Sequence, residues 1–118
     1  MSEREHRRAP RITQSFMARY RALSGGQGTW AVSPLRDFSS GGARFVCEDA
    51  FPVGTVLELQ LVLPSSKAPV PLQAQVTWVK PGLLNLTELG VAFSPVKADI
   101  QQLIDTAVVH FVRKQRIG

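Results

Sequence analysis

The sequence has little of what several large classes of protein depend on. Cys47 is the only cysteine among its 118 residues, so the chain cannot form a disulfide within itself or a cysteine-based metal cluster. Its apolar runs fall far short of the roughly 20 residues that a membrane helix needs. No apolar stretch of the kind found in signal peptides follows the charged N-terminus. These features are typical of a cytoplasmic protein without membrane insertion.

Groups that perform catalysis are also scarce. The chain contains nine acids and two histidines, His6 and His110. It has no P-loop, no nucleophile elbow and no metal-ligand spacing. We therefore expect no enzymatic activity, no metal and no cofactor.

Positive charge is unevenly distributed along the chain. The net charge is +5, and ten of the fourteen basic residues are arginines. Eight of these arginines lie in the first 44 residues, which hold three acids: Glu3, Glu5 and Asp37. The imbalance favours an anionic partner, and the planar guanidinium group suits phosphate or guanine. On charge alone, a solvated basic tail is the favoured explanation.

The hydropathy pattern predicts one all-β domain that ends in a helix. Strands with alternating apolar residues are predicted over 12–23, 29–35, 43–46, 55–63, 70–79 and 89–93. Apolar residues spaced at i, i+3, i+4 and i+7 then predict an amphipathic helix over 98–114. We expect a small six-stranded antiparallel β-barrel at 12–97, with the helix packed on it and residues 1–11 forming a flexible arginine-rich arm.

The same pattern predicts a loop at 37–42 and the direction of one aromatic side chain. Residues 37–42 are expected to form a loop between two strands. In the strand predicted over 70–79, strict alternation puts Trp78 on the same side as the apolar Leu72, Ala74 and Val76. Trp78 is therefore expected to point into the core.

Two short motifs stand out from this background. The first is Arg7-Arg8-Ala9-Pro10-Arg11, an R-x-x-x-R pattern, and the second is Asp37-Phe38-Ser39-Ser40-Gly41-Gly42, a D-x-S-x-x-G pattern. Alone, the first is common in basic tails and the second is typical of tight turns. Together, separated by the 25 residues from 12 to 36, they resemble the signature of the PilZ domain family. The strand segments Gly42–Phe45, Val76–Trp78 and Leu89–Phe93 are also similar to that family.

The resemblance implies a barrel that binds cyclic di-GMP, with the arm closing over the ligand. Its implied binding residues are Arg7, Arg8, Arg11, Asp37, Ser39, Gly41 and Gly42. Arg7 and Arg11 would contact guanine or phosphate, and Arg8 would either add a contact or face solvent. Asp37 would accept hydrogen bonds from guanine and Ser39 would donate one, while Gly42 would let the backbone approach closely. Trp78 is a candidate for packing on a guanine face.

One position departs from the family pattern, and other functions are open. His6 precedes the first motif, at a position that influences whether one ligand or a stacked pair binds in this family, so the stoichiometry is open. A stand-alone domain of this kind would signal through a downstream protein partner that the sequence does not identify. The alternatives are a PilZ-like protein-interaction module without ligand binding and a basic barrel that binds single-stranded nucleic acid.

Overall fold

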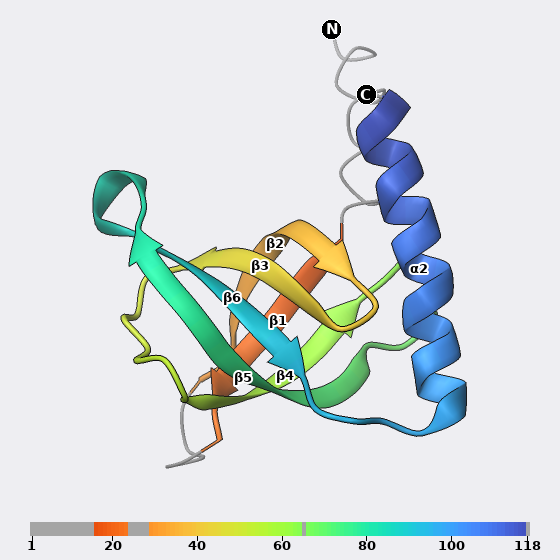
Figure 1. Cartoon of the computed structure of the whole chain (residues 1–118), viewed down its shortest axis with the longest axis horizontal. Helices are drawn as coiled ribbons and strands as arrows, with labels where there is room; N and C mark the ends of the chain where they lie inside the picture. Colours follow the sequence, from red (N-terminus) through yellow and green to blue (C-terminus); the bar gives the residue numbers. More distant parts are fainter. Residues whose placement is uncertain (1–15, 24–28, 65, 118) are drawn as a thin grey trace, which may run out of the picture.

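A computed structural model describes residues 16–23, 29–64 and 66–117, which form a closed antiparallel barrel with one helix against it (Figure 1). The elements are β1 (Met17–Ala22), β2 (Ala31–Ser39), β3 (Gly42–Cys47), β4 (Val56–Val62), β5 (Val70–Pro81), the short 3-10 helix η1 (Leu83–Asn85), β6 (Thr87–Phe93) and α2 (Ala98–Ile117). Around the barrel the strands follow the order β1-β2-β3-β6-β5-β4. The predicted six-stranded barrel with a C-terminal helix is confirmed.

Alternating side chains fill the interior of the barrel. Strand β4 shows the pattern best, because Leu57, Leu59 and Leu61 are at most 1% exposed while Glu58 and Gln60 between them reach the surface. Successive side chains on a strand point to opposite faces, so this alternation commits one face to the core. Leucines of β4 pack with apolar residues of the other five strands in one continuous cluster.

Helix α2 closes the core on the side next to β2. Its buried residues Ile104, Ala107 and Phe111 lie on one face of the helix. The Phe111 ring meets Phe16 and Phe38 edge-on, with centroids 5.2 Å and 5.9 Å away. Edge-to-face contacts of this kind add to the energy of burial. Aromatic packing therefore fixes the helix to the strand that carries the second motif.

The boundaries differ from prediction at two places that affect the site. The expected loop at 37–42 is wrong: residues 37–39 belong to β2, and only Ser40 and Gly41 form the turn that joins β2 to β3. The ladder closes with Ser39 opposite Gly42, so the motif lies on a tight hairpin. The helix continues to Ile117, three residues beyond the predicted end.

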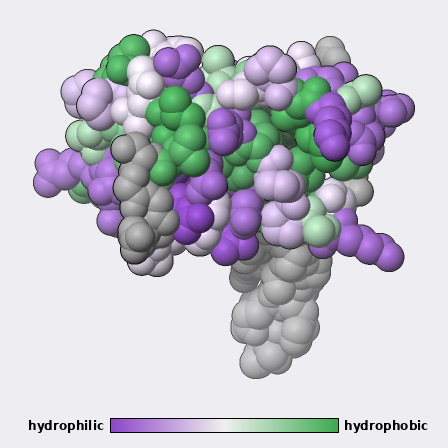
Figure 2. All heavy atoms as spheres, turned by 90° about the horizontal axis from the view of Figure 1, so that it is seen from below, coloured by the Kyte–Doolittle hydropathy of each residue, from purple (hydrophilic) through white to green (hydrophobic). Residues whose placement is uncertain are grey.

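The surface mixes apolar and polar side chains. Seen from below, hydrophobic side chains reach the surface in patches that hydrophilic ones separate (Figure 2). Within the described residues, no helix combines the length and the apolar character that crossing a membrane requires.

Candidate functional site

Two β-bulges reverse the alternation of side chains on one wall of the barrel. In β2 the pairing with β3 shifts between Leu35 and Asp37, which leaves Arg36 as the extra residue. In β5 the pairing with β6 shifts between Val76 and Trp78, which leaves Thr77 as the extra residue. An extra residue turns every following side chain to the opposite face. Both bulges thus direct outward a side chain that strict alternation would bury.

The two redirected side chains lie in one row across four strands. Asp37 of β2 pairs with Arg44 of β3, Arg44 pairs with Gly90 of β6, and Gly90 pairs with Trp78 of β5. Residues that pair in this way share a face of the sheet. The row therefore places a carboxylate, a guanidinium group and an indole on one outer surface, with a glycine between the last two.

This row crosses an open cleft of about 310 Å³. The cleft is lined by residues of β2, β3, β5 and β6: Asp37, Phe38, Ser39, Gly42, Ala43, Arg44, Thr77, Trp78, Gly90 and Val91. Of the predicted site residues, Asp37, Ser39 and Gly42 come together here, and Gly41 lies beside them in the turn. The predicted contacts from Arg7, Arg8 and Arg11, and the position of His6, lie outside the described residues.

Internal hydrogen bonds hold the motif residues on the hairpin. Asp37 Oδ1 accepts a bond from the Phe38 backbone N–H at 2.9 Å, and the Ser39 hydroxyl donates to the Gly42 carbonyl oxygen at 3.3 Å. A Cβ atom at Gly42 would collide with the Val91 carbonyl oxygen of β6. Gly42 is thus required for the close approach of β3 and β6, in addition to the predicted approach to a ligand.

Trp78 forms the far side of the cleft, so the prediction that it points into the core is wrong. Its side chain is 38% exposed, although Val76 two residues earlier is buried. The bulge at Thr77 causes the difference, and the Thr77 hydroxyl donates to the Gly90 carbonyl oxygen at 3.2 Å. A Cβ atom at Gly90 would collide with the indole. The absence of a side chain at Gly90 therefore lets the Trp78 indole lie directly against β6.

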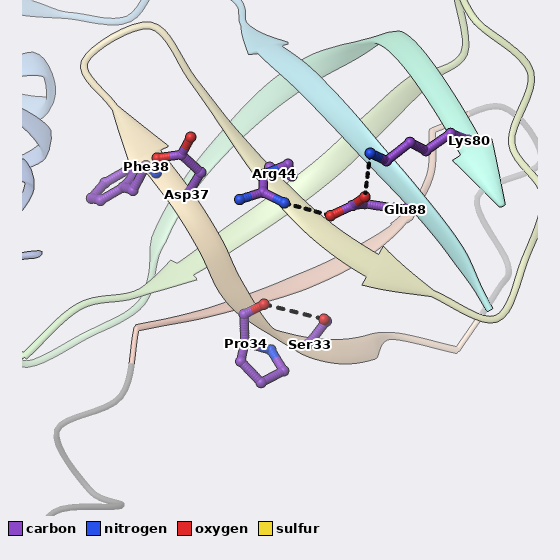
Figure 3. A network of polar contacts seen from close by, with 7 residues as sticks. All are labelled: Ser33, Pro34, Asp37, Phe38, Arg44, Lys80 and Glu88. Carbon is purple, nitrogen blue, oxygen red and sulfur yellow. Dashed lines mark hydrogen bonds and ion pairs between the residues drawn. The ribbon is translucent and has the colours of Figure 1, made fainter. Parts of the chain in front are cut away.

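Arg44 is the charged cleft residue that is absent from the predicted site. Its Nη1 donates to Glu88 at 2.5 Å, and Lys80 Nζ lies 3.4 Å from the other oxygen of the same carboxylate (Figure 3). The hydrogen bond from Arg44 and the nearby Lys80 hold the pKa of Glu88 below its usual value. The two-residue turn at 40–41 pairs Arg44 with Asp37 on one face, whereas the loop expected at 37–42 predicts no such pairing.

A second cavity of about 440 Å³ lies where β2 separates from the end of β3. It is larger than the cleft, but its charged lining residues are Arg36, Glu48 and Asp49. Two carboxylates and one cation disfavour an anionic ligand. We therefore assign the candidate site to the cleft. In the described residues, no three His, Cys, Asp or Glu side chains gather in a way that could hold a metal ion.

Comparison with known proteins identifies the family and similar folds. Residues 4–110 match the model of the PilZ domain. The comparison with curated proteins finds no match. The fold is similar to the Bacillus subtilis inhibitor of motility MotI/DgrA, with a TM-score of 0.68 and 17% identity over 86% of this chain and 49% of that one. It is also similar to K. pneumonia MrkH in its apo state, with a TM-score of 0.68 and 17% identity over 88% of this chain and 50% of that one.

A third similar structure contains a ligand. The PilZ domain of YcgR from Escherichia coli, solved with c-di-GMP, matches with a TM-score of 0.62 and 16% identity over 86% of this chain and 85% of that one. The chain spans about half the length of MotI/DgrA and MrkH.

The closed barrel, the hairpin motif and the match over residues 4–110 define one class of protein, the small β-barrel domains of a single family. The chain belongs to the PilZ domain family, whose members are c-di-GMP receptors and not enzymes.

Proposed function

We propose that this chain binds cyclic di-GMP in the cleft between Asp37 and Trp78. The main support is the cross-strand row that brings the second motif and an exposed indole to one open surface. The Asp37 carboxylate accepts hydrogen bonds from N1–H and N2–H of guanine, and the Ser39 hydroxyl bonds to a phosphate or a base. Trp78 packs on a guanine face, since an exposed indole and a purine stack favourably. Gly41 and Gly42 allow the ligand close to the hairpin.

The N-terminal arginines complete the proposed site. Arg7 and Arg11 supply guanidinium groups for phosphate and for the O6 and N7 edge of guanine, and Arg8 either adds a contact or faces solvent. Like charges in the arm repel each other until a dianion lies between the arm and the hairpin. Amide exchange tests this closure: the arm amides gain protection when cyclic di-GMP saturates the protein. An arm that is protected without ligand, or that exchanges freely at saturation, contradicts it.

The signal to a downstream protein passes, in this proposal, through the hairpin to α2. The Gln101 side chain of α2 donates to the Ser40 carbonyl oxygen in the hairpin turn at 3.1 Å. Phe38, between the two motif residues Asp37 and Ser39, packs on Phe111 of the same helix. A ligand that displaces the hairpin therefore acts on both of these contacts with α2.

Calorimetric titration tests the proposed function. Cyclic di-GMP binds with micromolar or tighter affinity, whereas GTP and cyclic di-AMP bind far more weakly. Adenine carries a donor where guanine has O6, so it opposes the arginine groups. Absence of cyclic di-GMP binding, or equal binding of cyclic di-AMP, refutes the proposal. Tighter binding of single-stranded RNA that falls steeply with added salt would favour the nucleic-acid function instead.

A further inference from the structure

The positive charge inside the cleft comes from a single described residue. Arg44 is the only cation among the described side chains that line it. Other described arginines lie elsewhere: Arg21 has its guanidinium carbon 4.3 Å from the Trp30 ring centroid, Arg19 lies over the same ring, and Arg36 lines the second cavity. A ligand in the cleft therefore meets one guanidinium group whose position is known.

That guanidinium lies beside the carboxylate expected to recognise guanine. Arg44 and Asp37 are directly paired across β3 and β2, and side chains paired in this way start about 5 Å apart. Figure 3 shows the Arg44 guanidinium between Glu88 and Asp37. Its hydrogen bond to Glu88 uses Nη1. A guanidinium carries five N–H donors, so others are available to a ligand on the side of Asp37.

The chemistry of guanine fits this pair. Its pairing edge presents N2–H and N1–H as donors and, next to them, O6 as an acceptor. A carboxylate can take the two donors while an adjacent cation donates to O6. O6 has two lone pairs, so a second arginine can still reach it from the N7 side. Adenine reverses the pattern, because its exocyclic group is a donor.

On the basis of the proposed function, we propose that Arg44 is an additional ligand-binding residue, which donates a hydrogen bond to O6 of the same guanine whose N1–H and N2–H groups bind Asp37. The ion pair with Glu88 positions the Arg44 guanidinium at the cleft before the ligand binds. Asp37 and Arg44 then recognise one base as a unit, and the selectivity for guanine comes from the barrel wall as well as from the arm.

Affinity measurements with Arg44→Ala test the binding role. We expect a loss of about ten-fold in cyclic di-GMP affinity, as for one charge-assisted contact to a base. Arg36→Ala is the matched control, because it removes the same charge one residue from Asp37 but outside the cleft. We expect it to stay within about two-fold of wild type. If Arg44→Ala fails to fold, Arg44→Gln retains most of the stem and a donor without the charge.

The outcomes separate the two proposals. Wild-type affinity in Arg44→Ala, or an equal loss in Arg36→Ala, overturns the role of Arg44 and leaves cyclic di-GMP binding intact. A wild-type protein that does not bind cyclic di-GMP overturns both proposals.

A double-mutant cycle tests whether Asp37 and Arg44 share one base. If they do, Asp37→Ala combined with Arg44→Ala loses little more affinity than Asp37→Ala alone, because groups that act as a unit are non-additive. Losses that multiply in the double variant would place Arg44 on a different part of the ligand and overturn the shared-base assignment.

Discussion

Two walls of this barrel are built from similar strands but carry different chemistry. The regular wall, formed by β1, β4 and the first half of β5, pairs without interruption from Met17–Val62 to Ala22–Leu57 and from Val56–Gln75 to Leu61–Val70. The cleft wall, formed by β2, β3, β6 and the second half of β5, contains both bulges. Where side chains alternate without a break, every second one is buried in the core. One extra residue in a strand instead turns a polar or aromatic side chain outward. The difference between the walls is therefore a difference in register more than in composition.

The largest expected effect comes from breaking the regular wall. Leu59 is 1% exposed in the middle of β4, so Leu59→Ala leaves a cavity and is expected to cost about 2–5 kcal/mol of unfolding free energy. Urea denaturation measures this loss. Asp37→Ala is the comparison on the cleft wall, where the side chain is exposed. A loss of unfolding free energy as large as that of Leu59→Ala would contradict the distinction between the walls.

The arm should affect binding and leave folding unchanged. Arg7→Ala and Arg11→Ala are each expected to lower cyclic di-GMP affinity by about 2 kcal/mol or more, because each removes a charge-assisted contact. The melting temperature should stay close to wild type. Calorimetry and thermal melting measure the two quantities, and unchanged affinity in both variants would place the ligand away from the arm.

Two substitutions test whether the Trp78 indole contributes to binding. Trp78→Ala deletes the stacking surface, with an expected loss of about 1–3 kcal/mol of affinity. Gly90→Ala retains Trp78 but forces it from its position, since the new Cβ atom would collide with the indole. Gly90→Ala should therefore weaken cyclic di-GMP binding, as Trp78→Ala does. Binding that survives both substitutions would exclude Trp78 from the site.

The smallest effect is expected at alkaline pH, at the end of the barrel away from the motif hairpin. Burial raises the pKa of Cys47 to about 11 and that of Tyr20 to about 12. For both residues the pKa in the folded state lies above the pKa in the unfolded state. The stability that each buried neutral group contributes is therefore fully present below its unfolded-state pKa, and it falls as the pH rises toward its folded-state pKa. We expect a loss of about 1 kcal/mol between about pH 8 and pH 10 from Cys47. Urea denaturation at several pH values should show a shallower decline in Cys47→Ala, and an equal decline would contradict burial of the neutral thiol.

The elements that could be predicted from the sequence are those whose apolar residues recur at a regular spacing. The leucines of β4 and the stripe on α2 both follow a fixed period, and the barrel and helix were predicted from them. Trp78 was misplaced because nothing in residues 70–81 marks the extra residue at Thr77, whose bulge depends on pairing with β6. Arg44 was missed for a related reason: its pairing with Asp37 depends on the length of the hairpin turn, and the outward direction of the pair depends on the bulge at Arg36.

Amide chemical shifts during titration with cyclic di-GMP test the cleft assignment most directly. The prediction is that shifts concentrate on the cleft wall, at Asp37 to Arg44, at Thr77 and Trp78 and at Gly90, while amides of β4 from Val56 to Val62 stay in place. Shifts that centre on β4, or on the second cavity at Glu48 and Asp49, would contradict the assignment of the site to the cleft.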